Sequence, residues 1–346
     1  MTDVRQPSRS SRWIFVPVAL VVVLGVAWSG FWWFAAQRAE ATIAAWIEQE
    51  AGHGRLYSCA SRTVGGFPFR IEVRCAQPAM ELTGLQPPRV IKARDLVGLA
   101  QVYQPNLIIA EIAGPVSIAE TGQPAAWQAD WALAQASLRG VAGRPERLSV
   151  VIERVTFNQA NGGGADTLGS ADHLELHVRR SAAATDDKPV VDFAAEVAGA
   201  VVRRGPLGAR PLDAEITGAL RGVSDLRPKP LPERLKEWQA AGGRLELTKL
   251  RIKQGEAVAV AAGDVGLSPA GRPDGAFNIT MAGFDALVRE LVGAGGNLQL
   301  GLLAGLAFLG RPAEIEGKRA VSVALRFSDG ATFLGPIPLG RMEPFY

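Results

Sequence analysis

The sequence contains few potential metal ligands of the histidine and cysteine types, because the 346 residues include only three histidines and two cysteines. His173 and His177 form an H-x3-H pattern, which on a helix would place both rings on one face. Here Leu174, Leu176 and Val178 alternate with polar residues, which predicts a strand. Four positions along a strand separate two side chains by ~13 Å, so one metal ion cannot bridge these rings. We therefore expect no metal site and no cofactor.

No motif in the sequence predicts a reaction. There is no G-x-S-x-G nucleophile elbow. The segment GGGADTLG at 162–169 lacks the Gly-Lys-Ser/Thr ending of a phosphate-binding loop. Asp186 and Asp187 are adjacent, which is typical of a polar turn rather than a pair of catalytic carboxylates. We expect a protein that is not an enzyme, with exposed loops at 161–170 and 182–189.

The N-terminal region predicts a membrane anchor. No charged residue occurs between Arg12 and Arg38, and ~20 apolar residues suffice for a bilayer-spanning helix. Tryptophans favour the headgroup level, and they occur at both ends of the run: Trp13, Trp28, Trp32 and Trp33. A cleaved signal peptide has a shorter apolar region and small residues at its cleavage site. A buried core helix would not need basic flanks, so we expect an uncleaved transmembrane helix over 13–36.

Charges before the span predict its orientation. Arg5, Arg9 and Arg12 are opposed only by Asp3, so the positive-inside rule keeps residues 1–12 in the cytoplasm. We expect a single-pass inner-membrane protein, with a juxtamembrane helix and joint over 37–55 and a β-rich periplasmic domain over 56–346.

Net charge argues against nucleic-acid binding. Residues 1–12 hold three Arg and one Asp, so the other residues hold 34 basic and 33 acidic side chains. A nucleic-acid-binding domain would carry a basic excess on one face. The expected partner is instead the inner-membrane lipid bilayer.

The two cysteines flank a predicted hairpin. From Phe67 to Cys75 apolar and polar residues alternate, which predicts a half-buried strand, and Val64-Gly65-Gly66 supplies a turn before it. Cys59 and Cys75 could then face each other across the hairpin, and an oxidising compartment would favour a disulfide. Two free buried thiols are the alternative.

Two segments resemble a known family. CASRTVGGFPFRIEVRC at 59–75 is similar to the signature of the bacterial domain-of-unknown-function family 2125, and FSDGATFLGPIPLGRMEP at 327–344 is similar to its C-terminal pattern. The resemblance spans nearly the whole chain. It implies one N-terminal anchor and a long β-rich envelope domain, and it supplies no catalytic residues because the family has no established activity.

The alternation of apolar and polar residues predicts a mainly β (α+β) fold in which long antiparallel β-meander sheets follow the transmembrane helix. Gly/Pro turns separate the alternating runs, and AGRP occurs twice, at 142–145 and 270–273. This recurrence is either a trace of an internal repeat or a common turn used twice. A few short helices are expected within 231–243, 284–296 and 298–309.

A β-rich, nearly neutral, membrane-tethered domain without catalytic motifs suggests a protein that binds or conveys a lipid or other hydrophobic molecule. The layout resembles that of AsmA-like lipid-transport proteins, which is an analogy of architecture. We expect an apolar groove that includes Leu302 and Val323. The alternative is a structural or interaction protein of the envelope whose sheet edges contact a protein partner. Sequence alternation is the same for an open groove and a closed core.

Overall fold

The computed structural model describes residues 15–141, 144–161, 164–185, 189–203, 210–223, 230–283 and 310–346. The start of the anchor at Trp13 lies outside the described residues. So do the helices expected within 284–309, with Leu302, and the first two residues of the first AGRP turn.

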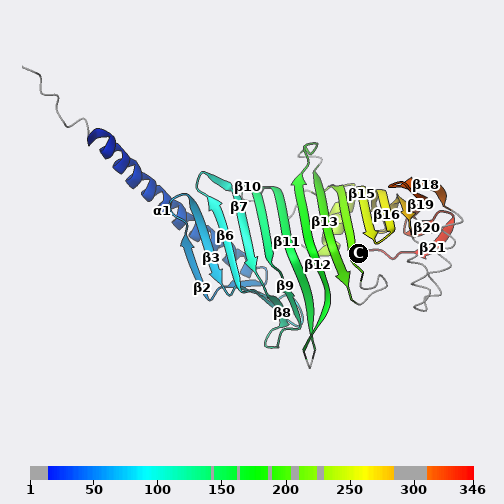
Figure 1. Cartoon of the computed structure of the whole chain (residues 1–346), viewed down its shortest axis with the longest axis horizontal. Helices are drawn as coiled ribbons and strands as arrows, with labels where there is room; N and C mark the ends of the chain where they lie inside the picture. The colour runs from blue at the N-terminus through cyan, green and yellow to red at the C-terminus, as the bar shows by residue number, and fades with distance from the viewer. Residues whose placement is uncertain are drawn as a thin grey trace, which may run out of the picture.

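One long apolar helix opens the described chain. Helix α1 (Phe15–Ala51) runs without a break for 37 residues, or ~56 Å, and projects from one end of the sheet (Figure 1). Its uncharged part, up to Gln37, is ~34 Å long, which exceeds the ~30 Å hydrocarbon thickness of a bilayer. Among the described residues, α1 is the one helix long and apolar enough to cross a membrane.

The rest of the described chain is an antiparallel meander with one short helix, α2 (Leu231–Ala240), which lies within the predicted range 231–243 and has Pro232 in its first turn. The strands are β1 (Arg55–Ser58), β2 (Ser61–Gly65), β3 (Arg70–Ala76), β4 (Ala79–Leu82), β5 (Arg89–Lys92), β6 (Asp95–Gln101), β7 (Gln104–Ala113), β8 (Val116–Glu120), β9 (Trp127–Asp130), β10 (Leu133–Val141), β11 (Arg144–Asn161), β12 (Gly164–Arg180), β13 (Val190–Val202), β14 (Leu212–Arg221), β15 (Arg244–Gln254), β16 (Ala257–Leu267), β17 (Pro273–Ala282), β18 (Arg311–Ile315), β19 (Lys318–Ser328), β20 (Ala331–Leu334) and β21 (Ile337–Arg341). The mainly β, antiparallel prediction is confirmed.

The N-terminal strands form two layers that share β11. The first layer pairs β2, β3, β6, β7, β10 and the first half of β11 in that order. The second layer pairs β1, β4, β5, β8, β9 and the second half of β11. Each strand of one layer continues into a strand of the other through a short link, so the sheet is folded along one crease. Gln77 and Arg154 lie at this crease with positive φ angles of 48° and 51°.

Beyond β11 the meander continues as a single row. Consecutive strands pair from β11 to β17, β17 then pairs with β19, and β18 and β20 share the other edge of β19. The sheet therefore runs from β2, beside α1, to β21 at the far end (Figure 1).

Two local expectations were wrong. Strand β2 continues to Gly65, so the turn begins at Gly66, and β3 begins only at Arg70. Phe67 and Phe69 thus lie in the β2–β3 loop, because the alternating pattern extended beyond the strand that it predicted. Strand β12 begins at Gly164, so most of the segment expected as an exposed loop at 161–170 is strand.

Full burial is rare in this sheet. Among the described residues, Val155 and Val258 are the large side chains less than 2% exposed. Val258 belongs to a cluster with Ala282, Ile315 and Ala320, where β16 and β17 meet β18 and β19. The packed core therefore lies at the end of the sheet far from α1.

Candidate functional site

The strand register aligns three rows of uncharged, nonpolar residues along one face of the sheet. Each of twelve consecutive strands contributes three residues, and each residue is aligned with a member of the same set on neighbouring strands. The members are Ile71, Val73, Cys75, Leu96, Gly98, Ala100, Ile108, Ala110, Ile112, Ala134, Ala136, Leu138, Leu148, Val150, Ile152, Leu174, Leu176, Val178, Phe193, Ala195, Val197, Ala214, Ile216, Gly218, Leu247, Leu250, Ile252, Ala259, Ala261, Gly263, Phe277, Ile279, Met281, Val321, Val323 and Leu325. We call this set the apolar face.

The apolar face is long because strand alternation stays in phase across the meander. Twelve strands spaced by ~4.8 Å extend it for ~50 Å. Where the pattern of β15 shifts by one residue after Leu247, a register irregularity restores the alignment at Leu250. The result is three continuous rows of apolar side chains that lead from β3, near the anchor, to β19.

Exposure changes along the apolar face. Near the anchor Ile108 is 46% exposed and Leu138 is 40% exposed. A β-carbon built on Gly98 would meet no atom within 4 Å. At the far end Leu247 is 9% exposed and Val323 is 6% exposed. The face is therefore partly open from β7 to β12, although Cys75 and Ala134 are buried, and it is covered at its far end.

The structure places one of the two expected groove residues. Val323 lies on the apolar face, opposite Ile279, but it is buried where the β20–β21 turn approaches: a β-carbon at Gly335 would lie 3.4 Å from Val323 Cγ2. Val323 thus belongs to the covered part of the apolar face rather than to its open part, and Leu302 lies outside the described residues.

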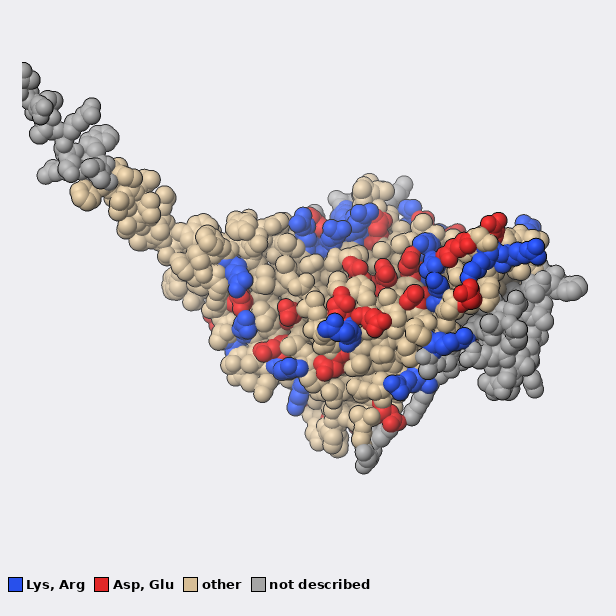
Figure 2. All heavy atoms as spheres, in the orientation of Figure 1, with Lys and Arg blue, Asp and Glu red and all other residues tan. Residues whose placement is uncertain are grey.

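The opposite face carries charged side chains, as Figure 2 shows over β11 to β16. Ion pairs cross between neighbouring strands there: Arg179 with Asp192, Lys249 with Glu215, and Arg221 with Glu246. The Lys249 ammonium donates a hydrogen bond to Glu215 and lowers the pKa of that carboxyl. Over these strands the face is charged, so the two faces of the sheet differ in polarity there, whereas at β16 to β19 the same face carries the buried cluster around Val258.

His173 and His177 lie on this polar face of β12, which confirms that they occupy a strand. Glu175, whose contacts with the two rings were not predicted, lies between them. Its carboxylate is 3.3 Å from His173 Nε2 and 2.6 Å from His177 Nε2. His173 Nδ1 is also 2.9 Å from Glu153, and hydrogen bonds to Glu153 and Glu175 raise the pKa of His173.

Both imidazole rings lower the pKa of the Glu175 carboxyl through hydrogen bonds. His177 Nδ1 is 2.8 Å from Ser149 Oγ, so hydrogen bonds tie β12 to β11 on this face. Within the described ranges, no group of three or more His, Cys, Asp or Glu side chains could hold a metal ion. The absence of a metal site stays a prediction for the whole chain.

Cys59 and Cys75 form the disulfide, with their Cα atoms 5.4 Å apart. Cys75 is aligned with Arg62 of β2, so the partner cysteine is not the residue directly opposite. Cys59 instead lies in the link from β1 to β2. The disulfide therefore fastens the crease between the two layers to β3, at the anchor end of the apolar face.

The β2–β3 loop is held against α1. Trp28 Nε1 donates a hydrogen bond of 2.8 Å to the Pro68 carbonyl, and Trp32 Nε1 donates one of 2.8 Å to the Arg70 carbonyl. The ring of Phe67 packs edge-on against Trp32 at 5.5 Å. These tryptophans were expected only as markers of the membrane interface. The contacts of Trp28 and Trp32 with the β2–β3 loop could not be predicted, because no sequence pattern links residues so far apart in the chain.

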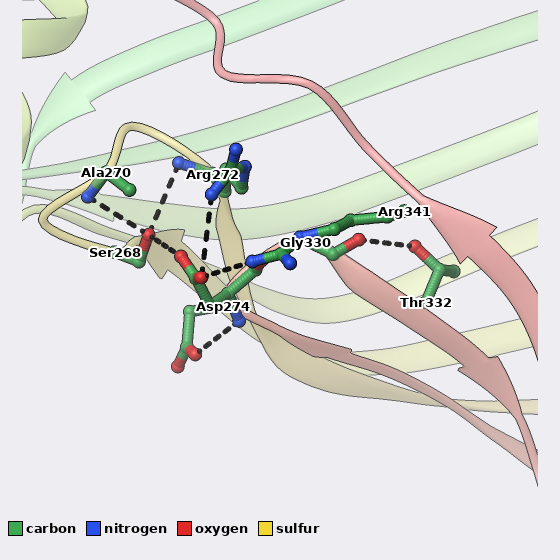
Figure 3. Close-up of polar contacts among 8 residues, drawn as sticks. Ser268, Ala270, Arg272, Asp274, Gly330, Thr332 and Arg341 are labelled. Atoms are coloured by element: carbon green, nitrogen blue, oxygen red, sulfur yellow. Dashed lines mark hydrogen bonds and ion pairs between the residues drawn. The ribbon is translucent and has the colours of Figure 1, made fainter.

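The C-terminal motif, the segment 327–344 that resembles the family pattern, contacts the β16–β17 turn at the far end of the sheet (Figure 3). Asp329 accepts hydrogen bonds of 2.7 Å from Ser268 Oγ and 2.7 Å from Arg341. The hydrogen bond from Ser268, with the charges of Arg272 and Arg341, lowers the pKa of Asp329. Gly330 has a φ of 81°, and a β-carbon there would lie 2.7 Å from the Met342 carbonyl, so the position favours glycine. The second AGRP turn therefore contacts the C-terminal motif.

A comparison with protein-family profiles matches residues 32–343 to the family described as "Uncharacterized protein conserved in bacteria (DUF2125)". The match includes the whole segment 59–75 and all but the last residue of the segment 327–344. No curated protein and no solved structure matches the chain. With nine-tenths of its length matched, the chain belongs to the bacterial domain-of-unknown-function family 2125.

Proposed function

We propose that this protein is a membrane-anchored carrier that binds the acyl chains of membrane lipids on the apolar face and conveys them along the sheet. The observation that carries the proposal is the unbroken apolar face, which starts at β3, next to the loop that contacts α1, and is exposed on β7 at Ile108 and on β10 at Leu138. An exposed apolar surface of this extent marks a binding surface in a soluble domain.

A lipid fits this surface better than a compact protein partner. The three rows are narrow and long, as an extended chain is, and they carry no charged group that would orient a polar ligand. Each buried methylene of an acyl chain contributes ~0.8 kcal/mol, so partial coverage suffices for reversible binding. The chain's own anchor would hold the open end of the face at the source of lipid. No step of this function requires catalysis.

The orientation belongs to the same proposal. We place residues 1–12 in the cytoplasm and the sheet in the periplasm, because Arg5, Arg9 and Arg12 precede the apolar run. The Cys59–Cys75 disulfide supports an oxidising compartment for the sheet.

A matched pair of substitutions tests lipid binding. Leu138→Glu places a charge on the open part of the apolar face, whereas Ser137→Glu places the same charge on the opposite face of β10. The full chain, purified in a mild detergent, is examined by native mass spectrometry and lipid extraction. We expect wild type and Ser137→Glu to retain phospholipid that Leu138→Glu loses, with equal melting temperatures. Equal lipid content in all three proteins would contradict the proposal.

One observation favours the interaction-protein alternative. Strand β21 pairs with β20 alone among the described strands, so its outer edge offers backbone groups to a partner strand. The alternative predicts that Leu339→Pro, at this edge, abolishes a cross-link to an envelope protein while lipid content stays at the wild-type level. Loss of bound lipid in Leu138→Glu, with the β21 cross-link unchanged, would count against this alternative.

A further inference from the structure

We propose that the β2–β3 loop inserts into the bilayer beside α1, and that the recess between them holds one acyl chain of a membrane phospholipid. This inference rests on the proposed crossing of a membrane by α1, but not on lipid conveyance by the sheet.

The position of the loop along α1 sets its depth. The loop contacts α1 at Trp28 and Trp32. Trp28 precedes Phe34, the last bulky apolar residue before the charged part of the helix, by six residues or ~9 Å. When α1 spans a membrane, the loop tip therefore reaches ~9 Å below the level of Phe34, which is the depth at which interfacial segments bury their apolar side chains.

The side chains of the loop suit this depth. Phe67 is 55% exposed and Phe69 is 64% exposed, on either side of Pro68. Two phenylalanines at the tip of a tight loop would be costly to leave in water. The first charged side chain after the tip is Arg70, which pairs with Glu72 at 3.0 Å, so charge returns where the chain leaves the tip.

Four carbonyl groups in and beside the loop accept hydrogen bonds from within the protein. Unpaired carbonyl groups are costly in lipid, so a lipid-exposed loop needs internal partners. The Pro68 and Arg70 carbonyls accept hydrogen bonds from the two indoles. The Gly66 carbonyl accepts one from Arg70 N at 3.1 Å, and the Phe69 carbonyl accepts one from Val102 N at 3.0 Å. Pro68 has no N–H group to satisfy.

An apolar recess of about 700 Å³ lies between α1 and the loop, and Val22, Gly25, Val26 and the loop residues Phe67 to Phe69 line it. A β-carbon at Gly25 would meet no atom within 4 Å, so the helix leaves space on this side. A recess at this depth opens toward lipid tails. Its occupant is therefore an acyl chain of the surrounding bilayer.

Depth-dependent quenching tests the insertion. Because the native cysteines are joined, a fluorophore attaches only to the new thiol in Val21→Cys, Phe69→Cys or Gln123→Cys, each in the full chain reconstituted in phosphatidylethanolamine and phosphatidylglycerol vesicles. Nitroxide near the top of the lipid tails should quench the label at Phe69 strongly, and the label at Gln123, in the β8–β9 turn, weakly. Quenching at Val21 but not at Phe69 would overturn the inference and leave the anchor intact.

Filling the recess tests its occupant. Gly25→Leu adds volume inside the recess, and Ala27→Leu adds the same side chain to an exposed position that does not line it. We expect native mass spectra of Ala27→Leu to show one more bound phospholipid than those of Gly25→Leu. Equal lipid content would overturn the recess site. A lipid that only Leu138→Glu removes belongs to the apolar face, so failure of the recess leaves the proposed carrier function standing.

Discussion

The Cys59–Cys75 disulfide has a local consequence, because it fastens the crease to β3 beside the β2–β3 loop. Substitution of Cys75 by Ser should lower the free energy of unfolding by about 2–5 kcal/mol, the usual effect of losing a native disulfide. Urea denaturation of the full chain measures this change. The Cys59→Ser and Cys75→Ser double variant should lose no more than either single variant. Two reactive thiols per chain in the denatured, unreduced wild type would contradict the pairing.

His173 predicts a pH dependence of stability. Hydrogen bonds to Glu153 and Glu175 raise the pKa of His173, so its stabilising effect is complete below the ordinary histidine pKa and is lost as pH rises through the raised value. The pKa of Glu175 is lowered, so its contribution is lost only as pH falls below the ordinary carboxyl range. The neighbouring groups are His177 on the same strand, Glu153 on β11 and Glu196, which is aligned with Glu175 on β13.

The variant His173→Gln should therefore lose less stability than wild type between pH ~6 and ~8. The difference should stay under ~1 kcal/mol, because the cluster is partly exposed and screened by solvent. Urea denaturation at both pH values, with His53→Gln as the control, measures it. An identical pH dependence in wild type and His173→Gln would contradict the argument.

At the scale of strands, close backbone approach makes some glycines necessary and others dispensable. Gly263 in β16 has a φ of 151°, and a β-carbon there would lie 2.1 Å from the Ala276 carbonyl oxygen. Gly263→Ala should lower stability by about 2 kcal/mol, because neighbouring backbone must move. Gly98→Ala in β6 is the matched control and should change stability by less than ~0.5 kcal/mol, since its β-carbon enters open space.

Thermal unfolding of the two variants separates these cases. A large loss at Gly98 would show that another element covers the apolar face at β6. That result would also count against the open end that the proposed function needs.

Elements with regular alternation could be predicted from sequence, and elements that depend on distant contacts could not. The alternation around Leu174 and Leu176 predicted strand β12, and the spacing of apolar residues predicted an apolar face. The crease could not be predicted, because Gln77 and Arg154 are not typical of positive φ. Phe67 and Phe69 continued the alternation and were assigned to a strand, although Trp28 and Trp32 hold them in a loop.

The register across twelve strands likewise had to come from the structure. A shift of one residue in any pairing would move apolar side chains to the charged face. Alternation alone also could not show that the apolar face is open at Leu138 and covered at Val323, because coverage depends on which elements pack above each strand.

For the whole molecule, the proposed orientation places the sheet and the C-terminus outside the cytoplasm. A C-terminal alkaline phosphatase fusion should be active, since that enzyme needs an oxidising compartment, and a cytoplasmic fluorescent fusion at the same point should be dark. The same two fusions are made to a chain in which Arg5, Arg9 and Arg12 are replaced by Gln. Its phosphatase fusion should be less active than that of the wild-type chain, because the charge bias that sets the topology is lost. An inactive phosphatase fusion in the wild-type chain would contradict the orientation.

Binding of lipid along the apolar face is the central claim, and cross-linking in a membrane tests it most directly. The full chain is reconstituted with a phospholipid that carries a photoreactive group on its acyl chain, and the linked peptides are identified by mass spectrometry. The account predicts cross-links on the apolar face of β6 to β12, at Ile108, Leu138 and Leu176, and none on the charged face of the same strands. Cross-links confined to α1 and the β2–β3 loop would contradict it, because lipid would then touch the anchor without reaching the sheet.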